Sequence, residues 1–183
     1  MTEIASTGQL RASLVRWALV LVPGINVLGI LSARISFSGD QNPWFATLVK
    51  PAIYPPPIAF PIVWTALYVL MGVALAMVVS ARRAPGRGLA VAAFIVHLAA
   101  NMAWSPLFFG LHSITGALAD AVAMALTLMV AMALFARVRP VAAWLLVPYL
   151  GWVLFACVLN AQVLQANPDA DAPRDPAVLR IKL

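Results

Sequence analysis

A few polar side chains lie inside long apolar stretches of this sequence, and they are the first candidates for chemistry. His97, Asn101 and Trp104 are spaced i, i+4 and i+7, so they share one face of a helix. Trp104 and Asp120 lie on opposite sides of a short link centred near His112, each eight residues from it. They should therefore lie at a similar depth in the membrane. A carboxylate in apolar surroundings needs a donor, and any of the three could supply one. The favoured interpretation is a polar clasp between two helices, and a proton relay or a ligand contact is the alternative.

Aromatic side chains gather on two further predicted helix faces. On the first face, Trp64 and Tyr68 are four residues apart. The second face follows a spacing of three, four and four residues through Tyr149, Trp152, Ala156 and Asn160. Converging aromatic faces with a few polar groups suit a flat, apolar ligand that stacks on the rings. The spacing alone leaves a ligand pocket and simple core packing equally open.

The sequence indicates neither a metal site nor a covalent nucleophile. His97 has no second histidine or carboxylate at ligand spacing on its own helix. Cys157 is the only cysteine and lies in an apolar run, which excludes an intrachain disulfide and a thiolate metal cluster. We therefore expect no metal and no required cofactor.

The composition places all these groups in a membrane. Hydrophobic residues make up 63% of the 183 residues and charged residues only 10%, with a mean hydropathy of +0.95. A soluble globule of this length needs more polar surface. The net charge of +6 could suggest a nucleic-acid partner, but the basic residues form short clusters beside apolar runs. The positive-inside rule accounts for them, so no nucleic-acid partner is expected.

Five segments contain the roughly 20 apolar residues that cross a bilayer. They are residues 13–35, 58–80, 88–109, 114–137 and 141–166. We predict an all-α integral membrane protein with a single five-helix transmembrane domain over residues 13–166. Residues 1–12 are predicted to be an N-terminal extension, and residues 167–183 a flexible charged tail. The first apolar run lacks a convincing cleavage site, so we interpret it as a retained span.

Basic residues near the predicted helix ends indicate the orientation. Arg34 and Lys50 lie on one side, and seven arginines lie on the other: Arg11, Arg16, Arg82, Arg83, Arg87, Arg137 and Arg139. The positive-inside rule puts the larger group and the N-terminus in the cytoplasm and the long first loop outside. An outer-membrane or organellar location would remove the basis of this inference.

The loop from residue 36 to residue 57 is long and rich in proline. Loops beyond about 12 residues are uncommon unless they cover or line a site. Each proline fixes its own φ and restricts the residue before it, so the loop should hold one shape. We predict a lid over a pocket, formed by Trp44, Phe45, Lys50, Pro51, Ile53, Tyr54, Pro55 and Pro56.

Three ordered motifs resemble the TspO/MBR family of translocator proteins, tryptophan-rich sensory proteins and benzodiazepine-receptor-like proteins. The first is KP followed by PP and FPIVWTALY, which ends at Tyr68. The second is NMAWSPLFFG, from Asn101 to Gly110, and the third is VPYLGW with ACVLN, from Val147 to Asn160. The resemblance covers roughly residues 35–166, and the order and spacing of the motifs make it specific.

The resemblance implies a five-helix bundle, usually a homodimer, with a pocket between the helices under the first long loop. It implies binding of protoporphyrin IX or haem and, in some members, of sterols or benzodiazepine-type ligands, in a bacterial cell membrane. The expected function is translocation or sensing linked to porphyrin and oxidative-stress signalling. The expected ligand-binding residues are Trp64, Tyr68, His97, Asn101, Trp104, Asp120, Tyr149, Trp152, Ala156 and Asn160.

Two other functions stay open beside the ligand-binding one. Light-dependent porphyrin breakdown is attributed to some family members, and the tryptophans implicated there match Trp64 and Trp152. A scaffold that acts through partner proteins is the second alternative. The chain also departs from the family pattern: Phe45 and Ile53 stand where many members have a tyrosine and a tryptophan. These changes remove two polar aromatic groups from the lid.

Overall fold

Helices make up most of the described chain. The computed structural model describes residues 7–171 and contains no strand within that range. The elements are α1 (Thr7–Ile35), α2 (Pro43–Thr47), α3 (Ala59–Ser80), α4 (Arg87–Ser105), a π-helical turn η1 (Pro106–Gly110), α5 (Ile114–Val138), α6 (Pro140–Leu145) and α7 (Val147–Ala166). Five stretches are long and apolar enough to span a membrane. The predicted all-α class and five-span architecture are therefore confirmed.

Proline and glycine set the helix boundaries. Gly86 precedes α4 in the left-handed region, with φ of 76°, a conformation that glycine adopts without steric cost. The predicted single helix 141–166 is wrong in detail, because the helix breaks at Leu146 into α6 and α7. Pro148 explains the break, since it has no N–H and disfavours a helix passing through the preceding turn. Pro106 likewise marks the change from α4 to the π-helical turn.

Close backbone approach holds α1 against α3. A Cβ atom added at Gly72 would lie 2.6 Å from the Cα of Val22, and one added at Gly29 would overlap the ring of Tyr68. Small residues allow such approach in lipid, where packing and not water exclusion drives helix association. Gly24, by contrast, has no neighbour at its Cβ position. The close contact that binds α1 therefore lies on either side of the Pro23–Gly24 pair.

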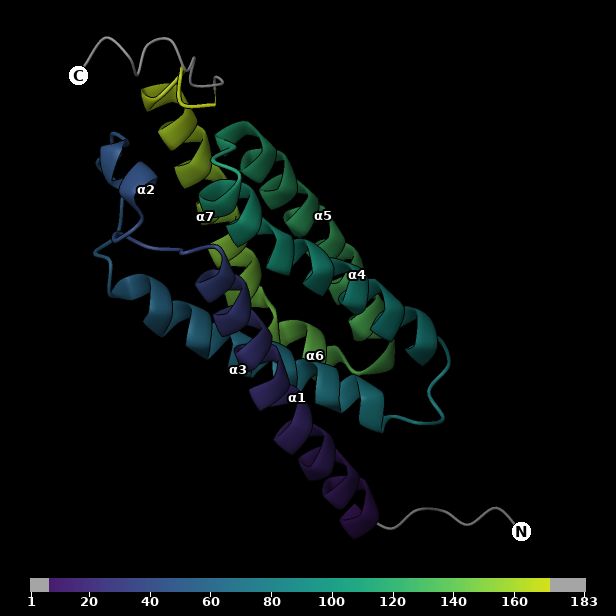
Figure 1. Ribbon diagram of the computed structural model, residues 1–183. Helices are drawn as coiled ribbons and strands as arrows, with labels where there is room; N and C mark the ends of the chain where they lie inside the picture. The colour runs from purple at the N-terminus through teal and green to yellow at the C-terminus, as the bar shows by residue number, and fades with distance from the viewer. Residues whose placement is uncertain (1–6, 172–183) are drawn as a thin grey trace, which may run out of the picture.

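The bundle is built from neighbouring helix pairs. Helices α4 and α5 run side by side, and α1 crosses α3 (Figure 1). The centre contains an apolar cluster in which Phe94 stacks on Phe135, with ring centroids 5.5 Å apart. Helix α1 is the least embedded span, and Leu19 is 70% exposed. Its outward face suits lipid.

Three parts of the predicted organisation need correction. Helix α1 begins at Thr7 and not at residue 13, so residues 7–12 of the predicted extension belong to this helix. Residues 1–6 lie outside the described chain. The loop 36–57 contains a short helix, α2, which Asn42 caps by accepting a hydrogen bond from the Phe45 backbone at 3.0 Å. Residues 167–171 are hydrogen-bonded to the loop and to α5, so this part of the tail is ordered. Residues 172–183 lie outside the described residues.

Candidate functional site

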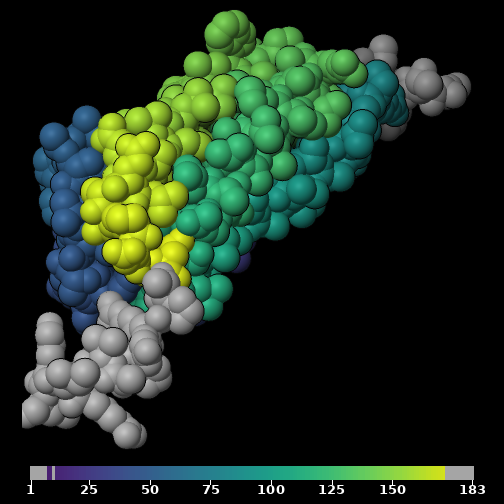
Figure 2. All heavy atoms as spheres, turned by 90° about the horizontal axis from the view of Figure 1, so that it is seen from above, coloured from purple at the N-terminus to yellow at the C-terminus, as the bar shows by residue number. Residues whose placement is uncertain are grey.

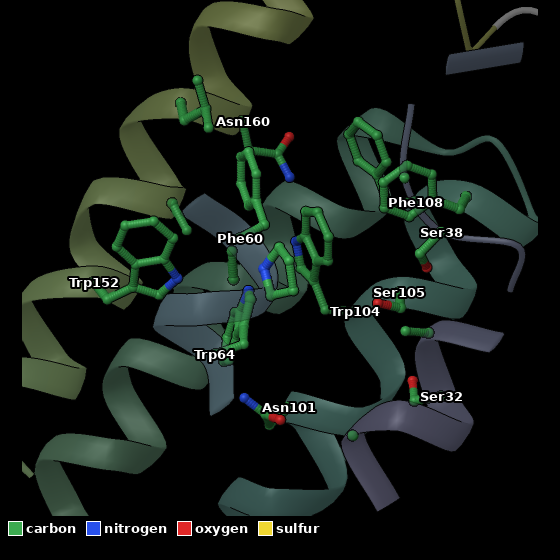
Figure 3. A pocket seen from close by; sticks show the side chains of 18 of the residues that line it. Ser32, Ser38, Phe60, Trp64, Asn101, Trp104, Ser105, Phe108, Trp152 and Asn160 are labelled. Atoms are coloured by element: carbon green, nitrogen blue, oxygen red, sulfur yellow. The ribbon is translucent and has the colours of Figure 1, made fainter. Parts of the chain in front are cut away.

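A cavity of about 480 Å³ lies between the helices beneath the first loop. Figure 3 shows aromatic side chains around it, among them Phe60, Trp64, Trp104 and Trp152. The ring centroids of Phe60 and Trp152 are 6.1 Å apart, and Trp104 stacks on Phe108 at 5.0 Å. Ligand pockets typically measure about 300–1,000 Å³ and have mainly apolar and aromatic walls. The cavity is therefore suited to a flat aromatic molecule.

Three side chains at this cavity, Ser38, Trp104 and Asn160, have polar atoms with no hydrogen-bond partner within residues 7–171. Asn160 is 3% exposed, and both its amide nitrogen and its amide oxygen are unpaired. The indole N–H of Trp104 is also buried and unpaired. A buried polar group without a partner costs about 1–3 kcal/mol. The cavity therefore presents an amide and an indole donor that a ligand could satisfy.

A chain of hydrogen bonds at the inner end of the cavity joins three buried side chains, Asn101, Tyr149 and His97, and the half-buried Thr127. The Asn101 amide donates to the Tyr149 hydroxyl at 2.6 Å, and that hydroxyl lies 2.9 Å from His97 Nε2. The other ring nitrogen, Nδ1, lies 3.2 Å from Thr127 Oγ1. Thr127 Oγ1 donates its hydrogen to the Ala123 carbonyl, so toward His97 it can only accept. The chain is therefore complete when His97 carries its proton on Nδ1 and accepts from Tyr149 at Nε2. Tyr149 is the central member, since it receives one hydrogen bond and donates the next.

The expected clasp around Asp120 does not form. No hydrogen bond joins Asp120 to His97, Asn101 or Trp104 in the described part of the chain, and its Oδ2 is buried without a partner. His97 and Asn101 use their polar atoms in the Tyr149 chain, and the Trp104 ring stacks on Phe108. Equal depth in the bilayer was thus a poor guide to contact, because rotation about each helix axis decides which groups meet.

The short helix α2 covers the cavity with aromatic side chains. Phe45 is 4% exposed, lines the cavity and packs against Phe109 at 5.2 Å between ring centroids. Trp44 stacks on His112 at 4.6 Å and so fixes α2 to the link between η1 and α5. Trp44 does not itself line the cavity. The loop therefore has the position of the predicted lid.

The remaining predicted lid residues support the loop's shape more than they line the cavity. Lys50 Nζ donates to the Phe45 carbonyl at 2.7 Å and lies 4.5 Å from the Phe45 ring centroid. Tyr54 does line the cavity, and its hydroxyl donates to Asp40 at 3.1 Å. Burial, and then the Asp40 charge, raise the pKa of Tyr54 above its ordinary value. The side chains that do not line the cavity are Lys50, Pro51, Ile53, Pro55 and Pro56.

The segment after α7 ties the lid to the rest of the bundle. Asn167 forms two hydrogen bonds with the Val49 backbone, accepting at 2.8 Å and donating at 3.0 Å. Four residues later, the Asp171 carboxylate accepts from the Ile114 and Thr115 N–H groups at the start of α5. Figure 2 shows the yellow end of α7 against the blue lid region. We call residues 167–171 the latch, because they connect the lid, α7 and α5.

Acidification is expected to weaken the latch. Partial burial alone would raise the pKa of Asp171, but hydrogen bonds from the Thr115 side chain and from the Thr115 and Ile114 backbones outweigh burial and lower it. The stabilisation is therefore complete above the ordinary Asp value of about 4 and is lost as the pH falls through the lower folded value. At neutral pH, Asp171→Asn should speed hydrogen exchange at Ile114 and Thr115 by roughly two- to fivefold.

The same experiment at low pH supplies the internal check. As Asp171 becomes protonated, the wild-type exchange rate should approach that of Asp171→Asn. Asp169→Asn is the matched control, because Asp169 accepts no hydrogen bond among the described residues. If the difference in exchange rate between the wild type and Asp171→Asn stayed constant with pH, the electrostatic role of the latch would be contradicted.

The cavity unites most of the predicted ligand-binding residues. Seven of the ten line it: Trp64, Tyr68, Asn101, Trp104, Trp152, Ala156 and Asn160. His97, Asp120 and Tyr149 do not. The sequence analysis missed a whole wall, which comes from α1 and the start of the loop: Asn26, Gly29, Ile30, Ser32, Ala33, Ser38, Gly39 and Asp40. Asn26 and Gly29 were the available signal, as a polar and a small residue within an otherwise apolar span.

Five spans around an aromatic cavity with a polar inner end define a multi-pass membrane protein with an internal cavity. The TspO/MBR family model matches residues 19–165. The tryptophan-rich protein TspO of Chlorobaculum tepidum is 43% identical over 143 residues, covering 77% of this chain and 90% of that protein. The translocator protein of Sus scrofa is 34% identical over 163 residues, covering 86% and 92%. The chain belongs to the TspO/MBR family.

A third relative extends the comparison to another bacterial protein. Protein CrtK of Rhodobacter capsulatus is 36% identical over 126 residues, which cover 68% of this chain and 79% of that protein. The family match includes α3, α4 and α5 in full and α7 up to residue 165, so it includes three of the helices that carry the aromatic cavity walls. The expectation of this family from the three motifs is thereby confirmed.

Proposed function

We propose that this protein is a membrane translocator or sensor that binds a tetrapyrrole, protoporphyrin IX or haem, in the cavity under α2. The observation that carries the proposal is the aromatic wall of Trp64, Trp104 and Trp152 beside the unpaired Asn160 amide. Stacking on indole rings favours a flat conjugated ring, and the amide can orient it. The names of the relatives, translocator protein and tryptophan-rich sensory protein, support the general role.

The chemistry of the cavity also indicates how a tetrapyrrole would be held. No lysine or arginine is among the side chains that line the cavity in the described chain, and Asp40 is. The propionates therefore have no cationic partner there, and binding rests on the rings and on the Asn160 and Trp104 donors. A sterol, which cannot stack, would use the apolar walls alone. We infer that the ring system supplies most of the affinity.

A dark titration tests the proposal. Purified protein in nanodiscs is titrated with protoporphyrin IX and with its dimethyl ester, and tryptophan quenching is followed. We expect saturable quenching at micromolar ligand, and the two affinities should agree within about threefold, because an exposed ion pair is worth only about 0–1 kcal/mol. Absence of saturable quenching by either compound would refute tetrapyrrole binding. A strong preference for the free acid would refute the ring-based mode.

Photochemical breakdown of the bound porphyrin is a second candidate, favoured because Trp64 and Trp152 line the same cavity. Illuminating the complex of the wild type and of Trp64→Phe/Trp152→Phe separates the two functions. A sensor or carrier predicts no protein-dependent bleaching. The enzyme predicts that the double variant keeps dark quenching through Trp104 and loses the product. Undiminished product from the double variant would exclude a catalytic role for this pair.

A further inference from the structure

A second cavity, of about 670 Å³, opens at the end of the bundle opposite the lid. Its walls come from three separate parts of the chain: the beginning of α1, the turn after α3 and the junction of α5 with α6. Four of its lining residues are arginines: Arg16, Arg82, Arg83 and Arg139. No residue of the family motifs is among its walls, so it is separate from the site described above.

The charge in this second cavity has no counterpart in the described chain. No carboxylate lines it, and two described carboxylates, Asp40 and Asp171, belong to the lid end. Four guanidinium groups around one space repel one another unless an anion lies between them. Each guanidinium also offers five N–H donors in a planar fork that matches carboxylate and phosphate oxygens. The arrangement is typical of an oxyanion site.

Helix ends offer a simpler role for arginine, and one neighbour has it. Arg87 Nη1 donates to the Val79 carbonyl at 2.7 Å, near the C-terminus of α3, and Arg87 does not line the cavity. The four cavity guanidinium groups make no such hydrogen bond and no ion pair within residues 7–171. Capping of helix C-termini therefore accounts for Arg87 and leaves the other four unexplained.

A buried hydroxyl is a second, independent indication of a ligand. Ser13 lines the same cavity, is 8% exposed, and its Oγ has no hydrogen-bond partner in the described chain. Burial of an unpaired hydroxyl is unfavourable, and a phosphate oxygen would accept a hydrogen bond from it. Ser13 and Arg16 are three residues apart on α1, so they can address the same anion from one helix face.

The surroundings of the cavity indicate where the anion comes from. Val20 follows Ser13 at i+7 on the same face of α1 and is 62% exposed. Trp144, which is 73% exposed, lies five residues after Arg139. Exposed indoles are enriched at membrane–water interfaces. An apolar surface thus leads directly from the arginines along α1, as an acyl chain beneath a headgroup would require.

We propose that the second cavity binds the phosphate of an anionic phospholipid, with Arg16, Arg82, Arg83 and Arg139 and the Ser13 hydroxyl as its donors. The acyl chains then follow the outward face of α1 past Val20. Each juxtamembrane basic residue near an anionic surface strengthens the attraction to that surface by roughly fivefold. A site that gathers four of them around one phosphate retains its lipid where scattered charges do not.

Native mass spectrometry of the full chain in detergent tests this proposal. The probes are phosphatidylglycerol, phosphatidylcholine of the same acyl chains, and inorganic phosphate. The wild type should retain phosphatidylglycerol and not phosphatidylcholine. Arg82→Gln/Arg139→Gln should bind phosphatidylglycerol about tenfold or more weakly. Arg11→Gln/Arg137→Gln is the matched control, because it removes the same charge from the same end at residues that do not line the cavity.

The outcomes separate the possible explanations. Retention that falls in the cavity variant and not in the control supports the site. Equal loss in both double variants would show that the overall charge of this end attracts lipid, and it would overturn the cavity assignment. Equal retention of the two lipids would overturn anion recognition, and phosphate binding without lipid retention would overturn the lipid as its source. Ser13→Ala, which keeps all the charge, should lower retention with an unchanged salt dependence, and no change in retention would remove Ser13 from the site.

Discussion

Replacement of Tyr149 by phenylalanine should destabilise the protein by about 2 kcal/mol or more. The hydroxyl is fully buried and joins Asn101 to His97, at 2.6 and 2.9 Å. A hydrogen bond between membrane helices contributes on average only about 0.6 kcal/mol. The larger cost comes from the two partners that lose their contact, each of which carries a desolvation penalty of about 1–3 kcal/mol. The free energy of unfolding in mixed micelles is the measurement.

Tyr54→Phe is the matched control for this substitution. It also removes a tyrosine hydroxyl, but the bond to Asp40 lies at the exposed lid. We expect a change within about 0.5 kcal/mol, as for most surface substitutions. If Tyr149→Phe were equally mild, the Tyr149 chain would not be a structural element of the bundle. A double-mutant cycle with Thr127→Val would then show whether His97 relies on Thr127 alone.

Filling the cavity from α7 should reduce porphyrin affinity by at least about tenfold, since an indole occupies space that the ligand needs. Ala156 lines the cavity and is the smallest residue on the aromatic face of α7, so Ala156→Trp places the indole in the cavity. The dark quenching titration measures the loss. This prediction rests on the proposed function, because its probe is protoporphyrin IX.

Leu154→Trp provides the comparison for Ala156→Trp. Leu154 lies two residues earlier on the same helix, is 49% exposed, and does not line the cavity. The same indole at the outer face should leave affinity within about twofold of the wild type. Unchanged binding in Ala156→Trp would place the ligand elsewhere. Lost binding with an intact cellular phenotype would favour a scaffold that acts through partner proteins.

The spans and most of the site could be predicted from sequence because the bilayer imposes simple rules. A span needs about 20 apolar residues, so apolar runs of that length were enough to locate all five spans. Helical periodicity then placed Trp152, Ala156 and Asn160 on one face, and all three line the cavity. Tyr149 belongs to the same predicted face but lies beyond the inner end of the cavity. Periodicity gives the direction of a side chain and does not give the depth at which a cavity ends.

The contacts that sequence reasoning missed join residues far apart in the chain. Asn167 and Asp171 read as part of a charged tail, and their partners are 118 and 56 residues away at Val49 and Thr115. The error at Asp120 has the same cause. Asp120 and Trp104 lie at a similar depth, but the rotation of their helices about their own axes keeps the two side chains apart. The α1 wall was missed because apolar and small residues in a span are equally suited to lipid and to a cavity.

The odd number of spans has a further consequence for how the protein experiences its surroundings. Five crossings place the start of α1 and the end of α7 in different aqueous compartments, whichever way the chain is inserted. The arginine cavity then meets the lipid of one leaflet, and the latch meets the solution on the other side. Acidifying the compartment at the lid end reaches the latch and Asp40 but not the arginine cavity, and a change of lipid in the opposite leaflet reaches the arginine cavity but not the latch. The two ends can therefore respond independently to events on the two sides of one membrane.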